Sequence, residues 1–170
     1  ERITVTTTLY DYARSGNYDI SKVLETAIAA SSNDKKQLSY LIKKSAVKDP
    51  VIRYWAATGL LALGKDAQAA KPVLQKLLKD EKRYIGTVAA EALYHLGDKQ
   101  DALQHLYKAV KDSSVMSRLQ ALIALQAATP EELVSVEGEL EQITKNKTEY
   151  DKKAARYLLK RIAAFSGKSK

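Results

Sequence analysis

The sequence predicts an all-α protein in which about four to five antiparallel helix pairs stack into a solenoid. Asp34, Asp66 and Asp98 each stand just ahead of a segment with helical apolar periodicity, and the spacing between them is 32 both times. One further step reaches Thr129-Pro130, where Thr suits an N-cap and Pro suits the first helical position. Beyond residues 3–7 no segment alternates convincingly with period two, so we expect no sheet.

The length and composition fit one soluble globular domain. A chain of 170 residues can bury a core of its own without covalent staples. It has no cysteine, which excludes disulfides, thiol nucleophiles and thiolate metal sites. The longest apolar runs, such as residues 60–63, are far shorter than the roughly 20 residues that span a membrane. Because the chain begins with Glu1, we expect a processed chain or an excised piece.

Each repeated unit is expected to contain two helices. Asp49, Asp80 and Asp112 each end one helical pattern and offer an N-cap for the next, so four units begin near residues 34, 66, 98 and 130. Ahead of them, residues 9–31 form a partial leading pair, with a break at residues 15–17. We therefore expect a linker from an upstream domain over residues 1–8, one helical-repeat domain over 9–165 and a frayed tail over 166–170.

The first full unit shows the expected burial pattern. Its first helix carries one apolar stripe, which is made of Leu38, Leu41, Ile42, Ser45 and Ala46. Residues 51–63 of the second helix are apolar on most of their circumference, so neighbours must cover this helix on several sides. Trp55, the only tryptophan, is expected in the core, and Gly64 is expected to end the helix with a left-handed C-cap.

Residues in that second helix resemble a short HEAT-like repeat. The match is carried by Asp49-Pro50-Val51-Ile52-Arg53, Ala56-Ala57, Gly59-Leu60 and Leu63-Gly64. Ankyrin lacks support because its Thr-Pro-Leu-His signature is missing, and the tetratricopeptide pattern does not fit around Trp55. The resemblance implies a HEAT-like solenoid in which Arg53 forms an ion pair with an acid of a neighbouring unit.

A longer resemblance covers roughly residues 8–125. Residues 9–16 (LYDYARSG) and 53–60 (RYWAATGL), with 89–93 and 119–122, resemble the HEAT-like C-terminal region of bacterial sulfatases. This implies a noncatalytic accessory module that buttresses an upstream catalytic domain or mediates association, in a periplasmic or secreted protein. In that family a Cys or Ser two residues before a Pro becomes formylglycine beside calcium. Here Lys48, Ala70 and Ala128 occupy those positions. The resemblance therefore places calcium, formylglycine and sulfuric ester hydrolysis in a domain outside this chain.

Few residues could support chemistry in the chain itself. Glu91 and His95 lie one helical turn apart and could share a metal with Asp98 or Asp101, but His95 also suits a helix C-terminus. His105 is expected to pack or face solvent. The sequence has no Gly-x-Ser-x-Gly elbow and no phosphate-binding glycine loop. We expect no catalytic, cofactor-binding or metal-binding residues in this chain.

Two sets of residues are candidates for contacts with partners. Tyr10, Tyr12 and Tyr18 lie in the partial leading pair and could contact an upstream domain, or could cap the end of the solenoid. Residues 143–170 hold nine Lys or Arg against two acids, a net charge of +7 within the total of +8. Within this basic segment three residues four apart could contact an anion such as a sulfated polysaccharide, namely Lys152, Arg156 and Lys160.

The preceding segment offers an internal counterpart to that charge. Residues 131–141 include five glutamates, and an antiparallel pair would place them near the basic helix. Partial neutralisation is therefore the favoured expectation. A free-standing protein-binding scaffold is the alternative to the accessory module. A nucleic-acid-binding HEAT-like protein would need basic residues aligned along one surface, and a lyase of the bilin-attaching kind lacks an evident chemical centre.

Overall fold

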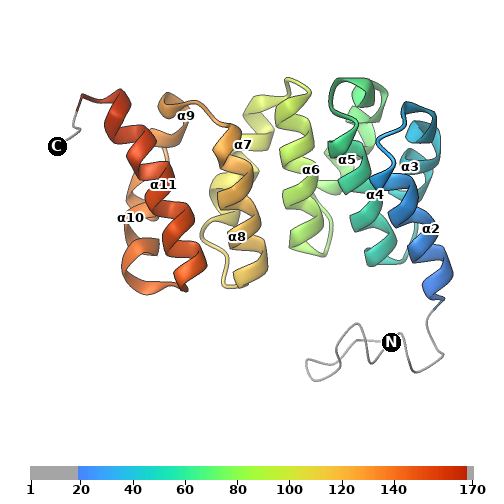
Figure 1. The fold of residues 1–170 in the computed structure, drawn as a ribbon, viewed down its shortest axis with the longest axis horizontal. Helices are drawn as coiled ribbons and strands as arrows, with labels where there is room; N and C mark the ends of the chain where they lie inside the picture. Colours follow the sequence, from blue (N-terminus) through green and yellow to red (C-terminus); the bar gives the residue numbers. More distant parts are fainter. Residues whose placement is uncertain (1–18, 168–170) are drawn as a thin grey trace.

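The computed structural model describes residues 19–167, and every regular element in this range is helical (Figure 1). The predicted all-α solenoid is confirmed. The predicted linker, the first part of the leading pair and residues 168–170 lie outside the described residues. The α-helices are α2 (Ile20–Ser31), α3 (Leu38–Lys44), α4 (Pro50–Ala62), α5 (Lys71–Leu77), α6 (Arg83–His95), α7 (Lys99–Ala109), α8 (Val115–Ala124), α9 (Pro130–Val134), α10 (Glu137–Asn146) and α11 (Glu149–Phe165).

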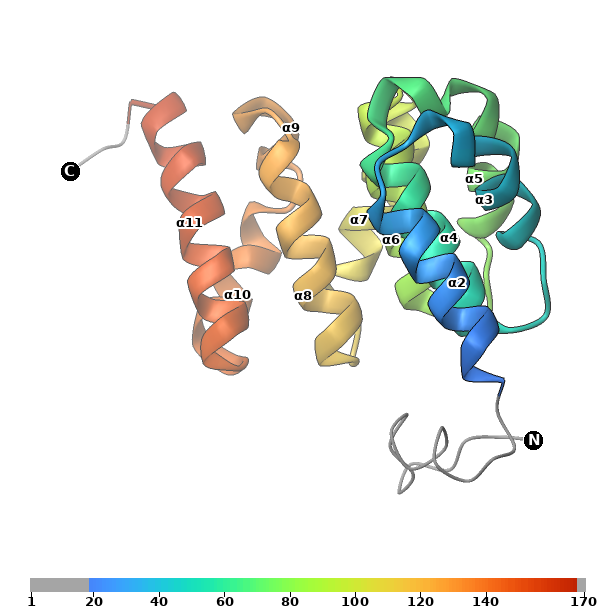
Figure 2. The same ribbon diagram turned by 45° about the vertical axis from the view of Figure 1, so that its right-hand side comes forward.

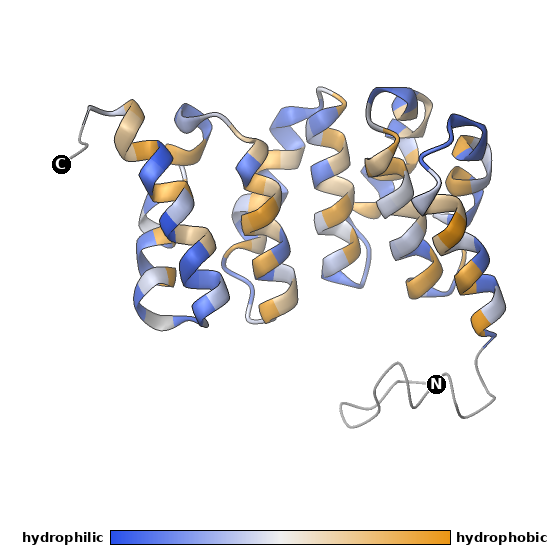
Figure 3. Ribbon diagram, in the orientation of Figure 1, coloured by the Kyte–Doolittle hydropathy of each residue, from blue (hydrophilic) through white to orange (hydrophobic). Residues whose placement is uncertain are grey.

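The helices form two layers. Helices α2, α4, α6, α8 and α11 pack against one another in that order, and we call them the second-helix layer (Figures 1 and 2). Helices α3, α5, α7 and the α9–α10 segment form the first-helix layer. Short 3-10 helices at Lys35–Gln37, Gly64–Ala70 and Leu125–Ala127 join the elements. Apolar residues recur along each helix of the second-helix layer (Figure 3), because each helix is covered on several sides.

Helix ends explain where the pairs begin. The side chain of Asp49 accepts a hydrogen bond from the backbone N–H of Val51 at 2.8 Å, and Pro50 follows as the first residue of α4. Thr129 and Glu132 form a reciprocal capping box at the start of α9. Gly64 adopts a φ of 51°, so the predicted left-handed residue after α4 is confirmed.

Three of the predicted aspartate caps are wrong. Asp66 lies inside a 3-10 helix, and α5 begins later, at Lys71. The N-caps of α6 and α8 are Lys82 and Ser114, two residues after Asp80 and Asp112. Both aspartates still accept a backbone N–H from the N-cap residue, but their carboxylates also bind an arginine of the preceding second helix. This second role accounts for their position ahead of the helix.

Burial differs from the expected pattern at two positions. Leu41 and Ser45 are buried as predicted, whereas Ala46 is exposed beyond the end of α3. Trp55 is only half-buried, because the smaller Ala56 and Ala57 occupy the closest contacts of α4. Its ring meets Tyr54 edge-on, with 6.0 Å between the ring centroids. Trp55 therefore packs against the edge of the core.

Arginine–aspartate pairs connect successive second helices. Arg53 binds both carboxylate oxygens of Asp80 at 2.7 and 2.9 Å, and its remaining nitrogen donates to the carbonyls of Val47 and Lys48. The predicted ion pair between neighbouring units is confirmed. Arg118 forms a buried pair with Asp151, in which two of its nitrogens donate to the same carboxylate oxygen at 3.2 and 2.7 Å. The pair between Arg83 and Asp112 is similar but has an exposed arginine.

Gly59 marks the closest approach between α2 and α4. A Cβ atom at this position would lie 2.8 Å from the Cα of Ala30 and 2.9 Å from Cδ1 of Leu41. One of these atoms belongs to the backbone of α2, so relief would require the whole helix to move. Glycine is therefore required here for packing, although it lowers helix propensity.

Gly59→Ala should destabilise the fold by roughly 1–3 kcal/mol, the usual cost of overpacking, despite the better helix propensity of alanine. The matched control is Gly138→Ala in α10, where an added Cβ meets nothing within 4 Å. We expect the control to be as stable as the wild type or slightly more stable. Urea denaturation measures both, and equal stability of the two variants would contradict the close approach.

Candidate interaction surface

Large apolar side chains are exposed almost entirely on one layer. Of the ten such residues in the described part of the chain, nine lie on α2, α8 and α11, and Val134 of α9 is the exception. The most exposed are Ile28, Met116 and Tyr150, at 70%, 68% and 74%. Scattered surface hydrophobics are ordinary, but a concentration on one layer is typical of a protein interface.

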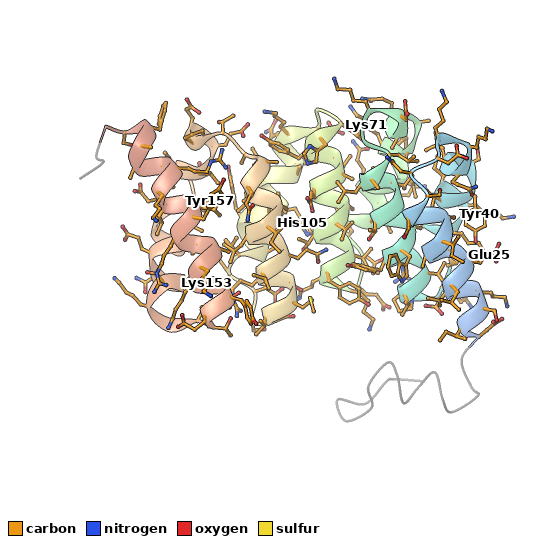
Figure 4. The ribbon with its side chains drawn as sticks, viewed as in Figure 1. Glu25, Tyr40, Lys71, His105, Lys153 and Tyr157 are labelled. Atoms are coloured by element: carbon orange, nitrogen blue, oxygen red, sulfur yellow. The ribbon has the colours of Figure 1, made fainter. Side chains whose placement is uncertain are left out.

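Equal positions in successive helices form a row across this layer. The ninth residue after each N-cap belongs to what we call the central row, which consists of Ile28, Thr58, Glu91, Ile123 and Tyr157. Ile123 and Tyr157 are about half exposed. Figure 4 shows Tyr157 along α11 together with Lys153, which is one turn earlier. The central row thus crosses the face of the second-helix layer that the first-helix layer does not cover.

A second row lies two helical turns earlier on the same face. Seven residues make almost two complete turns, so the second and ninth residues after an N-cap share one stripe. The second residues are Ser21, Val51, Tyr84, Met116 and Tyr150, and the large apolar Met116 and Tyr150 are strongly exposed. Both rows can be recognised only after the N-caps are placed. The signal in the sequence is that their members lie two or nine residues after the N-cap of each second helix.

Glu91 is the only charged member of the central row. It is half-buried, and burial raises its pKa above the ordinary value for glutamate. Within residues 19–167 its carboxylate has no hydrogen bond or ion pair. The more deeply buried Asp80 and Asp151 each hold an arginine, although Oδ1 of Asp151 has no partner. Glu91 is thus an uncompensated carboxylate on an otherwise uncharged row.

The two histidines have separate environments. His95 is exposed at the last position of α6, where the helix dipole favours a cation. His105 is half-buried in α7 with its ring above Gly86, and burial, together with Lys108, lowers its pKa. In the described part of the chain no three His, Asp or Glu side chains come together in a way that could hold a metal ion.

The three predicted anion contacts are all on α11. Lys152 is largely covered and pairs with Glu149 at 2.9 Å, whereas Arg156 and Lys160 are exposed and form no ion pair within residues 19–167. The structure thus keeps two of the three cations available to solvent. Tyr10, Tyr12 and Tyr18 lie outside the described residues, so the predicted contact with an upstream domain stays a prediction.

The glutamates of residues 131–141 were predicted to neutralise the basic residues of α11, and this prediction is wrong, because those with ion pairs bind cations of other elements. Glu132 accepts hydrogen bonds from Tyr94 at 2.7 Å and from Lys99 at 3.2 Å. Glu139 pairs with Lys111. These partners belong to α6, α7 and the residues after α7, because α9 and α10 follow α7 within the first-helix layer.

Comparison with known families identifies the repeat. The model of the family described as HEAT repeats matches residues 38–126, which run from α3 to the end of the third unit. No curated protein matches the chain. None of the helices in the described range combines the length and apolar character needed to cross a membrane.

Glu91→Gln should raise the melting temperature at neutral pH, because the amide removes a poorly solvated charge. Burial makes the pKa of Glu91 higher in the folded chain than in the unfolded chain. The penalty is therefore absent below the unfolded pKa and complete above the folded pKa. The gain should vanish near or below about pH 4 and be largest at about pH 8.

Circular dichroism melts at both pH values measure this difference. Glu25→Gln is the matched control, since Glu25 is an exposed glutamate on α2 of the same layer (Figure 4). We expect it to change the melting temperature little at either pH. A Glu91→Gln variant that is less stable than the wild type at neutral pH would show that the carboxylate has a stabilising partner.

Proposed function

The chain belongs to the HEAT repeat family, and we propose that it acts as a noncatalytic scaffold that binds a protein on the exposed face of the second-helix layer. Helical repeats of this kind stack into extended surfaces, and such surfaces serve protein interaction. The observation that carries the proposal is the one-sided distribution of exposed hydrophobics. Val115, Met116 and Ile123 on α8 and Tyr150 and Tyr157 on α11 form its densest part.

Interface physics favours these residues as contacts. Aromatic residues and methionine are enriched in protein interfaces, and they bury a large area with few rotatable bonds. The densest part lies on adjacent helices, because α8 packs directly against α11. The first-helix layer has no comparable surface among the described residues, since Val134 is its only exposed large hydrophobic. One face of the molecule is therefore suited to docking.

We further propose that the bound protein is the catalytic domain of the same polypeptide. The resemblance of residues 9–16 and 53–60 to the C-terminal region of bacterial sulfatases supports this assignment. On this proposal the chain buttresses that domain or shapes access to it, the parent is a periplasmic or secreted sulfuric ester hydrolase, and calcium and formylglycine belong to the catalytic domain. A free-standing scaffold that binds a separate protein is the alternative.

A photo-crosslinking phenylalanine analogue at Ile123 should give one adduct of defined mass in cells that make the whole polypeptide. The same analogue at Gln104, which is exposed on α7 of the other layer, should give none. Mapping the adduct by mass spectrometry decides between a partner within the same polypeptide and a separate protein. Equal adduct formation at both positions would contradict the proposal.

The end of α11 supports a second proposal, which is contact with a sulfated polysaccharide. Arg156 and Lys160 are exposed, and Lys152 lies on the same side with only its own-helix partner Glu149. Reversing the charge of all three should abolish retention on heparin without a change in helicity. The control reverses Lys35, Lys36 and Lys76, which are exposed in the other layer. If the variant with Lys152, Arg156 and Lys160 reversed is still retained on heparin, these residues do not bind the polysaccharide. They would then serve only to keep the C-terminal end of the solenoid soluble.

A further inference from the structure

Glu91 occupies the middle of the proposed docking face. In the central row it stands between Thr58 of α4 and Ile123 of α8. Its carboxylate is partly desolvated, the described residues supply it with no hydrogen bond and no cation, and its oxygens are still open to the outside. Sequences tend to break such rules where a ligand completes the interaction. The missing element is a positive charge that approaches from outside the layer.

We propose that Glu91 binds a lysine or arginine side chain of the partner protein, presented by an extended segment that crosses the layer from α6 toward α11. The inference rests on the proposed function, because it assigns the chemistry of the partner at the same face. The direction follows from the neighbours of Glu91. Toward α11 the next two positions are the exposed apolar residues Ile123 and Tyr157, whereas toward α2 the next position is the polar Thr58 and the apolar Ile28 follows only after it.

The spacing of the helices specifies the conformation of the segment. Packed helices lie about 8–10 Å apart, so adjacent positions of the central row are separated by about that distance. A polyproline-II segment has three residues per turn and rises about 3.1 Å per residue, so equivalent side chains recur about every 9 Å. When the basic residue of the bound segment contacts Glu91, the residues three and six positions later in that segment lie against Ile123 and Tyr157. Large apolar side chains fit at these two positions.

The charges beyond the apolar pair support the same orientation. Lys153 is exposed on α11 one turn before Tyr157, and Arg156 is exposed on the same helix. A segment that starts with a cation at Glu91 thus ends near cations, where acidic residues would be favoured. Opposite charges at the two ends of a binding site fix the direction of a bound segment more than they raise its affinity.

The test uses a synthetic proline-rich peptide with one arginine and with leucines three and six positions later. Its control has citrulline in place of arginine, which keeps the shape and removes the charge. Titration calorimetry with the full chain should show that the citrulline peptide binds about tenfold more weakly, the effect of losing one hydrogen-bonded charge pair. Glu91→Gln should weaken the arginine peptide similarly and should leave the citrulline peptide unaffected, whereas Glu25→Gln should change neither.

The outcomes separate this inference from the proposed function. If Ile123→Asp abolishes binding while Glu91→Gln and citrulline have no effect, the cation site is wrong and the docking face stands. Absence of saturable binding to the wild type overturns the arginine-led segment, and crosslinking at position 123 then decides the docking face independently. Binding that Ile123→Asp does not weaken would contradict both. Circular dichroism of each variant confirms that the helical fold is retained.

Discussion

Contact between successive second helices is the constraint on which the rest of the molecule depends. In a solenoid each unit buries its apolar surface only against its neighbours, so the distance between these helices sets the whole fold. Small residues make that distance short, as where Gly59 meets Ala30. At the start of the helices, Arg53 and Arg118 connect each unit to the next through Asp80 and Asp151. Buried pairs of this kind fix a register more than they add stability.

The same packing produces the face that we propose for docking. Because each inner second helix contacts two neighbours and the first-helix layer, only one stripe of its surface remains toward solvent. That stripe contains few charges in its middle, and its one central acid, Glu91, is held without a cation. Other acids of the fold hold a cation, as Asp80 does through both of its carboxylate oxygens. We infer that this carboxylate serves the proposed docking contact, since it has no partner within the described residues.

Local sequence signals predict the helix pairs. The features that they do not predict depend on contacts between units. Asp49-Pro50 and Thr129-Pro130 specify helix starts through their own side chains, so sequence spacing was sufficient there. Asp80 and Asp112 also face arginines 27 and 29 residues away, which no local pattern reveals. The sequence alone offers Glu91 no role beyond a disfavoured metal site with His95. Its burial and its place in the central row require the neighbouring helices to be aligned.

The two ends of the described solenoid differ in a way that bears on docking. Along α11 the cations Arg156 and Lys160 are exposed, and polar surface at a terminal repeat favours solubility. Along α2 the residues Ile20, Leu24 and Ile28 are 45–70% exposed, and nothing within residues 19–167 covers them. This apolar edge adjoins the same face that Ile28 shares with Glu91. Contacts at the N-terminal end and across the central row can therefore belong to one continuous interface.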